Sequence, residues 1–187
     1  MTLDPVVRSV AGRLSLREPQ SESLRRLASA LEEVPLIRDH RARSPEELTR
    51  MVEALRGRLP QLSDFERDFP SMCFALATGV GKTRLMGAFI TYLHAAYGYR
   101  HFFVLAPNLT IYNKLIQDFT PNTPKYVFKG VSEFAISAPQ VVTGDTYELT
   151  GALTGELYTP VQINIFNISK INSEVRGGKS PRIKRLS

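Results

Sequence analysis

A glycine-rich turn between two apolar segments constrains the fold of this chain more than any other feature. The turn contains, in order, Ala77, Thr78, Gly79, Val80, Gly81, Lys82 and Thr83. The apolar run from Ser71 to Ala77 predicts a short buried strand, and the apolar stretch from Gly81 to Tyr97 predicts a helix covered on several sides. A strand that passes through glycines into a helix favours an α/β fold.

The same turn has the composition of a phosphate-binding loop. Gly79 and Gly81 allow the backbone to curl, so that the amides of residues 78–83 converge on an anion at the start of the helix. Lys82 is then predicted to bind the β- and γ-phosphates of a nucleotide, and the hydroxyl of Thr83 to bind Mg²⁺. Leu76 replaces the first glycine of the general pattern G-x-x-x-x-G-K-[ST], so an accidental Gly-Lys-Thr turn is the alternative interpretation.

Helical signals dominate the residues before the turn. A first helix is predicted to begin near Pro19, and its apolar stripe contains Leu24, Leu27, Ala28 and Leu31. Ser44, Pro45 and Glu47 form a capping box that starts a second helix. We therefore expect a helical N-terminal segment over residues 1–70.

Strands alternate with a helix after the loop. His101–Ala106 predicts a buried strand, and Asn108 is predicted to cap a helix whose apolar face contains Tyr112, Leu115, Ile116 and Phe119. Shorter strands are predicted at residues 126–128, 140–143 and 161–166. This alternation predicts a parallel sheet flanked by helices within residues 71–172.

The charge of the chain favours a polyanionic partner. The net charge is +6 over 187 residues, and nucleic acid is the first candidate for such a protein. Residues 173–187 are predicted to form a basic tail, which fits either a solvated tail or a nucleic-acid-binding arm; its cations are Arg176, Lys179, Arg182, Lys184 and Arg185. No apolar run is long enough to span a membrane, and the single cysteine, Cys73, excludes an internal disulfide and is expected to be buried. The composition therefore suits a cytoplasmic protein.

The loop resembles motif I of superfamily two helicases and translocases, which also lacks the leading glycine. Leu16, Arg17 and Gln20 resemble the L-R-x-x-Q element that precedes motif I in several branches of that superfamily. Residues 72–119 and 161–171 are similar to the type III restriction enzyme Res subunit group. The resemblance implies a RecA-like P-loop NTPase domain, a helicase or translocase motor that uses ATP and Mg²⁺ to move on double-stranded DNA.

The resemblance also implies roles for individual residues and partners. Gln20 would recognise the adenine edge of ATP, because its amide can donate and accept hydrogen bonds at once. Asn108, Thr110 and Lys114, at the position of motif Ia, would contact the DNA backbone. In complete relatives a second motor domain and often a nuclease domain follow, and a Mod-like methyltransferase subunit is a further expected partner.

One motif of that family is absent from the sequence. No Asp-Glu-x-His box follows an apolar strand, although this box holds Mg²⁺ and positions the attacking water. Asp145 and Glu148 follow a short apolar run, but the preceding glycine favours a turn there. No catalytic set is therefore complete.

We expect an incomplete motor domain that binds ATP and DNA but hydrolyses ATP poorly alone. Apolar surface at Phe74, Leu105 and Ile165 is expected to be exposed in such a domain. A non-catalytic nucleotide- or nucleic-acid-binding remnant is the alternative. A small-molecule kinase is disfavoured, because no lid rich in arginine is evident in the sequence.

Overall fold

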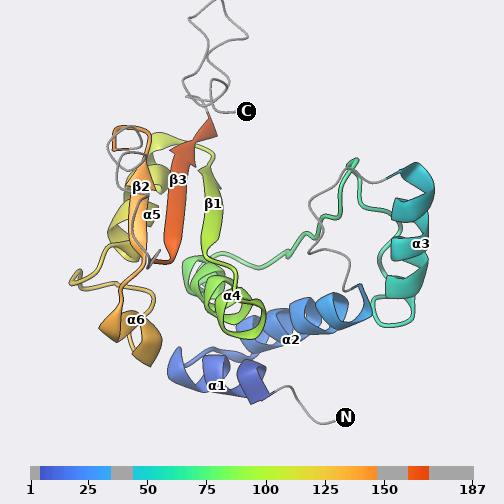
Figure 1. Cartoon of the computed structure of the whole chain (residues 1–187), viewed down its shortest axis with the longest axis horizontal. Helices are drawn as coiled ribbons and strands as arrows, with labels where there is room; N and C mark the ends of the chain where they lie inside the picture. The colour runs from blue at the N-terminus through green and yellow to red at the C-terminus, as the bar shows by residue number, and fades with distance from the viewer. Residues whose placement is uncertain (1–4, 35–43, 147–159, 169–187) are drawn as a thin grey trace, which may run out of the picture. The chain divides into compact units, whose positions relative to one another are not determined.

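The computed structural model describes residues 5–34, 44–146 and 160–168 (Figure 1). Its contacts divide the chain into two compact units. The first unit is Met1–Leu85 and the second is Met86–Ser187. The helix α4 (Lys82–Tyr97) begins in the first unit and continues into the second. The domain boundaries expected at residues 70 and 172 stay predictions, and the basic tail and Glu148 lie outside the described residues.

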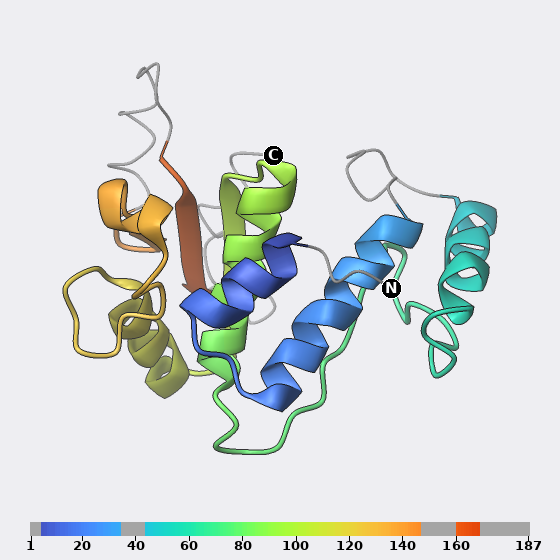
Figure 2. The same cartoon turned by 90° about the horizontal axis from the view of Figure 1, so that it is seen from below.

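Two consecutive helices begin the first unit (Figure 2). α1 (Pro5–Arg13) was not predicted, whereas α2 (Glu18–Glu33) begins next to Pro19, as expected. α1 buries Val7 and Val10, and the two helices pack against each other. β-branched valines are only moderate helix formers, so this packing rather than local propensity explains the helix.

The third helix, α3 (Pro45–Arg56), begins with the predicted capping box. The Ser44 hydroxyl accepts a hydrogen bond of 3.3 Å from the Glu47 amide, and the Glu47 carboxylate accepts one of 3.0 Å from the Ser44 amide. α3 contributes to a small hydrophobic cluster with the C-terminal part of α2; its buried members are Ala30, Val34, Met51, Val52, Leu55 and Phe65. The N-terminal helices therefore have a core of their own.

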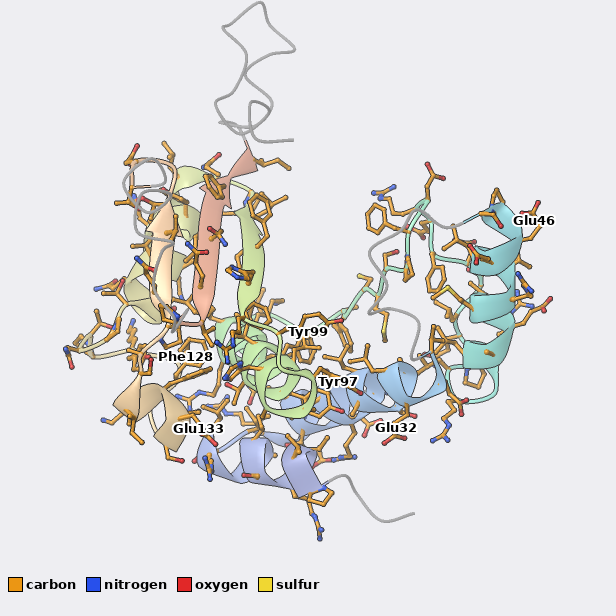
Figure 3. All side chains as sticks on the ribbon, viewed as in Figure 1. Glu32, Glu46, Tyr97, Tyr99, Phe128 and Glu133 are labelled. Carbon is orange, nitrogen blue, oxygen red and sulfur yellow. The ribbon has the colours of Figure 1, made fainter. Side chains whose placement is uncertain are left out.

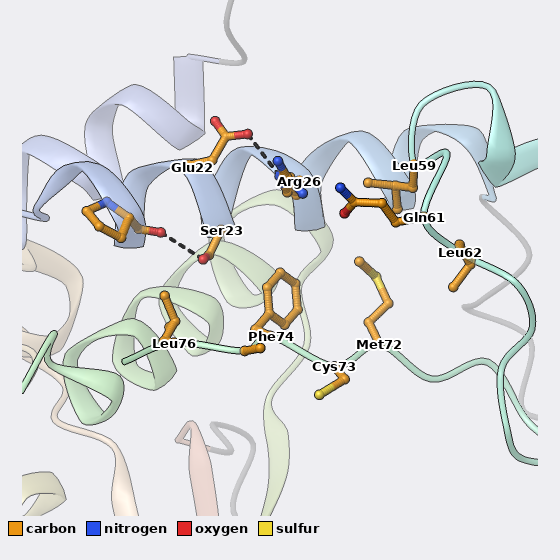
Figure 4. Close-up of a pocket in the computed structure, with 12 residues that line it drawn as sticks. Glu22, Ser23, Arg26, Leu59, Gln61, Leu62, Met72, Cys73, Phe74 and Leu76 are labelled. Carbon is orange, nitrogen blue, oxygen red and sulfur yellow. Dashed lines mark hydrogen bonds and ion pairs between the residues drawn. The ribbon is translucent and has the colours of Figure 1, made fainter. Parts of the chain in front are cut away.

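The segment from Ser71 to Ala77 is extended but forms no strand with any of the described residues, so the predicted strand is wrong. Alternate side chains behave differently: Met72, Phe74 and Leu76 are half-buried, whereas Cys73 is exposed rather than buried. The half-buried set lines a cleft of about 440 Å³ beside α2 (Figure 4). An apolar run specifies an extended chain with one packed face, but a strand also needs a partner for its backbone.

The second unit contains a parallel three-stranded sheet, as predicted. Its strand order is β1 (His101–Ala106), β3 (Gln162–Asn167), β2 (Gln140–Thr143), and both pairings are parallel (Figure 1). Val104 lies opposite Ile165 in β3, and the helix α5 (Leu109–Phe119) packs against β1 and β3. The order places β1 at one edge of the described sheet, next to the strand that is last in sequence, which requires crossover connections.

A buried aromatic cluster replaces the strand predicted at residues 126–128. Val127 and Phe128 lie in a turn and Tyr126 in no regular element, although Phe128 is 1% exposed. Figure 3 labels the Phe128 side chain. The Phe128 ring lies 5.5 Å from that of Phe119 and 4.9 Å from that of Phe134, in the short helix α6 (Ser132–Ile136), and both contacts are T-shaped. Burial of aromatic rings against α5 and α6, rather than strand pairing, explains the apolar character of this stretch.

The exposed apolar surface agrees only partly with the expectation. Leu105 is 47% exposed and its neighbour on the same face, Phe103, is 55% exposed, although the Phe103 ring stacks on that of Phe166. Ile165, in contrast, is 0% exposed, so the expectation was wrong for this residue. Ile165 is covered because it belongs to the central strand of the described sheet, whereas Leu105 belongs to an edge strand.

The N-cap of α5 provides a stability prediction. The Asn108 side chain accepts a hydrogen bond of 2.9 Å from the Ile111 amide, which confirms the predicted cap. We expect Asn108→Ala to lower the free energy of unfolding by about 1 kcal/mol, because one helix amide loses its partner. Asn113→Ala, at an exposed position in the same helix, is the matched control and should be neutral or slightly stabilising. Urea unfolding measures both, and equal losses would contradict a specific cap.

Candidate functional site

The predicted phosphate loop is a curled turn in the structure. Residues 78–80 form a turn, and α4 begins at Lys82. Gly79 has φ of +80° and Gly81 has φ of +92°, backbone conformations that residues with a side chain rarely adopt. The two glycines of the motif are therefore needed where the chain reverses, as the sequence predicted.

Lys82 reaches back across this turn. Its ammonium donates a hydrogen bond of 2.9 Å to the carbonyl oxygen of Ala77, the last residue before the turn. The residue is exposed, while Thr83 in the next position is half-buried. The ammonium of Lys82 is thus held at the loop by a backbone carbonyl, and its contact with phosphates stays a prediction.

Gln20 comes to the loop from a position 61 residues earlier in the chain. Its Nε2 donates a hydrogen bond of 2.9 Å to the carbonyl oxygen of Gly81, and its Oε1 accepts one of 2.8 Å from the Arg17 amide. Gln20 is 1% exposed, so the amide lies against the loop rather than in solvent. The structure thus brings the L-R-x-x-Q element and the phosphate loop together. Adenine recognition by Gln20 stays a prediction.

Gln20 and Gly81 approach each other very closely. A Cβ atom added at Gly81 would lie 2.6 Å from Gln20 Nε2, whereas one added at Gly79 would meet nothing within 4 Å. Gly81 is therefore required both by its backbone conformation and by the contact with Gln20. The glycine motif alone gives the first reason, but only the fold supplies the second.

A contact that the sequence did not indicate lies directly after the motif. Arg84 Nη1 donates a hydrogen bond of 2.7 Å to the carbonyl oxygen of Leu14. No motif could have identified this pair, because the acceptor is a backbone atom 70 residues away. Together with Gln20, Arg84 ties the loop to the region where α1 meets α2.

The three residues predicted to contact DNA lie in the second unit, on or before α5. Asn108 and Thr110 are exposed, and Asn108 caps the helix. Lys114 forms a short ion pair with Asp118 one turn further on. The helix start thus exposes the polar residues Asn108 and Thr110, while Lys114 already has an acidic partner.

The carboxylate of Asp118 is unusual because its side chain is only 4% exposed. Its Oδ2 pairs with Lys114, and its Oδ1 is buried with no hydrogen-bond partner among the described residues. A buried carboxylate is costly without a partner, so Lys114 contributes to the stability of α5. A substitution of Lys114 alone would therefore change both charge and stability.

The described residues contain no group of three or more potential metal ligands among histidine, cysteine and acidic side chains. Asp145 is exposed in a turn after β2, as the preferred interpretation of the sequence predicted. Thr146 closes this turn with a hydrogen bond of 3.1 Å from its amide to the carbonyl of Thr143. The loop motif contains two hydroxyl groups, those of Thr78 and Thr83, and the binding of Mg²⁺ by Thr83 stays a prediction.

These elements define the class of the protein. The fold is α/β, with a small parallel sheet flanked by helices, and corresponds to a RecA-like P-loop NTPase domain with a helical N-terminal segment. The family described as type III restriction enzyme, res subunit, matches residues 13–185. The chain belongs to this family, and it carries a helicase-like, ATP-binding N-terminal domain of the restriction type.

The family match confirms the resemblance that the loop and the neighbouring segments indicated. No curated protein and no solved structure matches the chain. Domains of this family generally use ATP and Mg²⁺, and the family suggests an interaction with DNA. None of the helices in the described ranges combines the length and apolarity needed to cross a bilayer.

Proposed function

We propose that residues 78–83 bind the triphosphate of ATP with Mg²⁺, and that the start of α5 contacts the backbone of double-stranded DNA. The curled loop carries this proposal: two glycines with positive φ reverse the chain directly before α4, and Lys82 spans the turn. An anion at this point would receive amide hydrogen bonds and the positive end of the α4 dipole.

The residues present fit a magnesium nucleotide. Lys82 would hold the phosphates, and the Thr83 hydroxyl would be a ligand of Mg²⁺, which retains several waters and needs few protein ligands. The metal would neutralise phosphate charge when bound. Gln20 is the predicted contact to adenine, and its two present hydrogen bonds leave a second N–H of Nε2 and a second lone pair of Oε1 for the base.

Binding without efficient hydrolysis is the expected behaviour of the isolated chain. Its sequence contains no Asp-Glu-x-His box, the element that holds Mg²⁺ and orients water in relatives. We expect titration calorimetry to show much tighter binding of ATP than of AMP, because the loop contacts phosphates. ATP hydrolysis is expected to stay near background, with or without duplex DNA.

The two measurements separate the candidate functions. Equal binding of ATP and AMP would contradict a phosphate site. ATP hydrolysis stimulated by DNA would contradict the inactive domain and the non-catalytic remnant alike, since another carboxylate would then have to replace the missing box. A Mod-like methyltransferase partner remains a prediction from the family resemblance, and co-purification with such a subunit would test it.

The DNA-binding part of the proposal needs variants that respect the Lys114–Asp118 pair. The reference protein is Asp118→Asn, and the test protein is the double variant Lys114→Met, Asp118→Asn. The two differ only in the cation at position 114, and neither contains an unpaired carboxylate at position 118. If Lys114 contacts a phosphate, the salt dependence of duplex binding should fall by about one unit of slope. Fluorescence anisotropy at several salt concentrations measures this slope.

The matched control for DNA binding is Lys125→Met, which removes the same charge from another exposed position. Thr110→Ala should weaken binding slightly and to the same extent for all sequences, as expected for a contact to the backbone. The salt dependence of duplex binding could have the same slope in the double variant, in Asp118→Asn and in the control. That result would show that Lys114 does not contact DNA.

A further inference from the structure

Arg84 connects the first turn of α4 to the end of α1. It follows Thr83 directly, and its guanidinium donates a hydrogen bond of 2.7 Å to the Leu14 carbonyl oxygen. The contact joins residues 70 positions apart, and both belong to the first unit. Arg84 therefore links the helical turn that carries Lys82 and Thr83 to the N-terminal helices.

The Leu14 carbonyl is available because of the way α1 ends. The Leu16 amide donates to the Ala11 carbonyl at 2.9 Å, the Ser15 amide donates to that of Gly12 at 3.1 Å, and Ser15 has φ of +48°. This hydrogen-bond pattern is a Schellman motif. It reverses the chain and leaves the Leu14 carbonyl without a partner inside the helix. A guanidinium suits that carbonyl, because it donates a charged hydrogen bond to the negative end of the helix dipole.

A second contact holds the other side of the motif. Gln20 Nε2 donates to the Gly81 carbonyl at 2.9 Å, and Gln20 Oε1 accepts from the Arg17 amide at 2.8 Å. Lys82 and Thr83 thus lie between two attachments, at residues 81 and 84, to the stretch from Leu14 to Gln20. A loop that is held on both sides loses less conformational entropy when it binds a ligand.

We propose that Arg84 is a positioning residue of the nucleotide site. By holding the first turn of α4 against Leu14, it keeps the loop amides and Lys82 in the geometry that binds a polyphosphate. The turn between α1 and α2 therefore supports the proposed site, because it provides the carbonyl that Arg84 binds. The proposal rests on the proposed function, because it requires that residues 78–83 bind phosphates.

The test compares Arg84→Met, Arg84→Gln and the control Arg8→Met in the full chain. Arg8 is exposed on α1, so its variant removes the same charge from the same helical region. Titration with ATP and with inorganic tripolyphosphate gives the dissociation constants, and thermal unfolding gives the stability. Arg84→Met should raise both dissociation constants by roughly tenfold, the effect of one charged hydrogen bond.

Two features separate positioning from a simple charge effect. Loss of a distant charge is screened by salt, so the tenfold difference should persist at about 0.5 M KCl if Arg84 acts by holding the loop. Arg84→Gln keeps hydrogen-bond donors without the charge and should recover part of the affinity at that salt concentration. Arg8→Met should leave both constants unchanged.

Three results would overturn the proposal. One is a loss of affinity in Arg84→Met that disappears at high salt, since Arg84 would then act only as a charge. Another is a lower melting temperature with unchanged dissociation constants in Arg84→Met or, should that variant not fold, in Arg84→Gln. The third, weak binding of tripolyphosphate by the unaltered chain, would reject the proposed function itself, whereas the first two leave it intact.

Discussion

Lys82→Ala is expected to weaken the binding of ATP by roughly 100-fold, the largest effect of any single substitution outside the core. The lysine spans the loop to the Ala77 carbonyl at 2.9 Å, so its ammonium lies beside the loop that we propose to bind the phosphates. Without this cation, the proposed site would hold the triphosphate only through the loop amides and through Mg²⁺ bound at Thr83. Titration calorimetry with ATP and tripolyphosphate measures the loss, which should be similar for both ligands.

The fold of the Lys82 variant should be almost unchanged. Lys82 is exposed, and a contact between an exposed ammonium and a carbonyl contributes little to stability. Lys125→Ala, which removes the same charge from an exposed position in the second unit, is the control and should bind ATP like the unaltered chain. If Lys82→Ala and Lys125→Ala bind ATP equally well, residues 78–83 do not form the phosphate site.

The second large effect is expected for Gly81→Ala. Its φ of +92° disfavours any side chain, and the added Cβ would lie 2.6 Å from Gln20 Nε2. We expect a loss of about 2–4 kcal/mol of stability, from backbone strain together with displacement of a buried amide from its hydrogen bonds. The binding of ATP should weaken as well, because Gln20 can no longer hold the Gly81 carbonyl.

Two other glycines separate the two causes. Gly79→Ala introduces the same kind of backbone strain, with φ of +80°, but its Cβ meets nothing within 4 Å. It should cost only about 1–2 kcal/mol. Gly57→Ala, at a position with φ of −59° and free space, should be neutral or stabilising by up to about 1 kcal/mol. Urea unfolding ranks the three variants, and equal losses at Gly79 and Gly81 would show that the Gln20 contact is unimportant.

Local signals in the sequence predicted where several of the helices begin. The capping box at Ser44, the cap at Asn108 and the start of α4 after the glycines are all present. Each of these depends on residues within four positions of one another, so their chemistry can be recognised without a fold. The strands at residues 101–106, 140–143 and 161–166 were also predicted, and β3 in fact covers Gln162–Asn167.

The errors occurred where long-range contacts decide the structure. Residues 71–77 and 126–128 are apolar enough for strands, but neither stretch pairs with a described strand. Phe128 is buried by aromatic neighbours instead, and Met72, Phe74 and Leu76 pack beside α2. The hydrophobicity of a segment predicts that it is buried, but it does not predict which elements bury it.

The sequence by itself determined the curvature of the glycine-rich loop and the lysine that directly follows it. Glycines at positions 79 and 81 permit a backbone that other residues oppose, and a lysine follows them directly. Only the tertiary structure decided what holds that loop in place. The partners are Gln20 for the Gly81 carbonyl and the Leu14 carbonyl for Arg84, which are 61 and 70 residues distant. Such contacts arise because the packing of α1 and α2 brings buried polar groups to the loop, where each must find a hydrogen-bond partner.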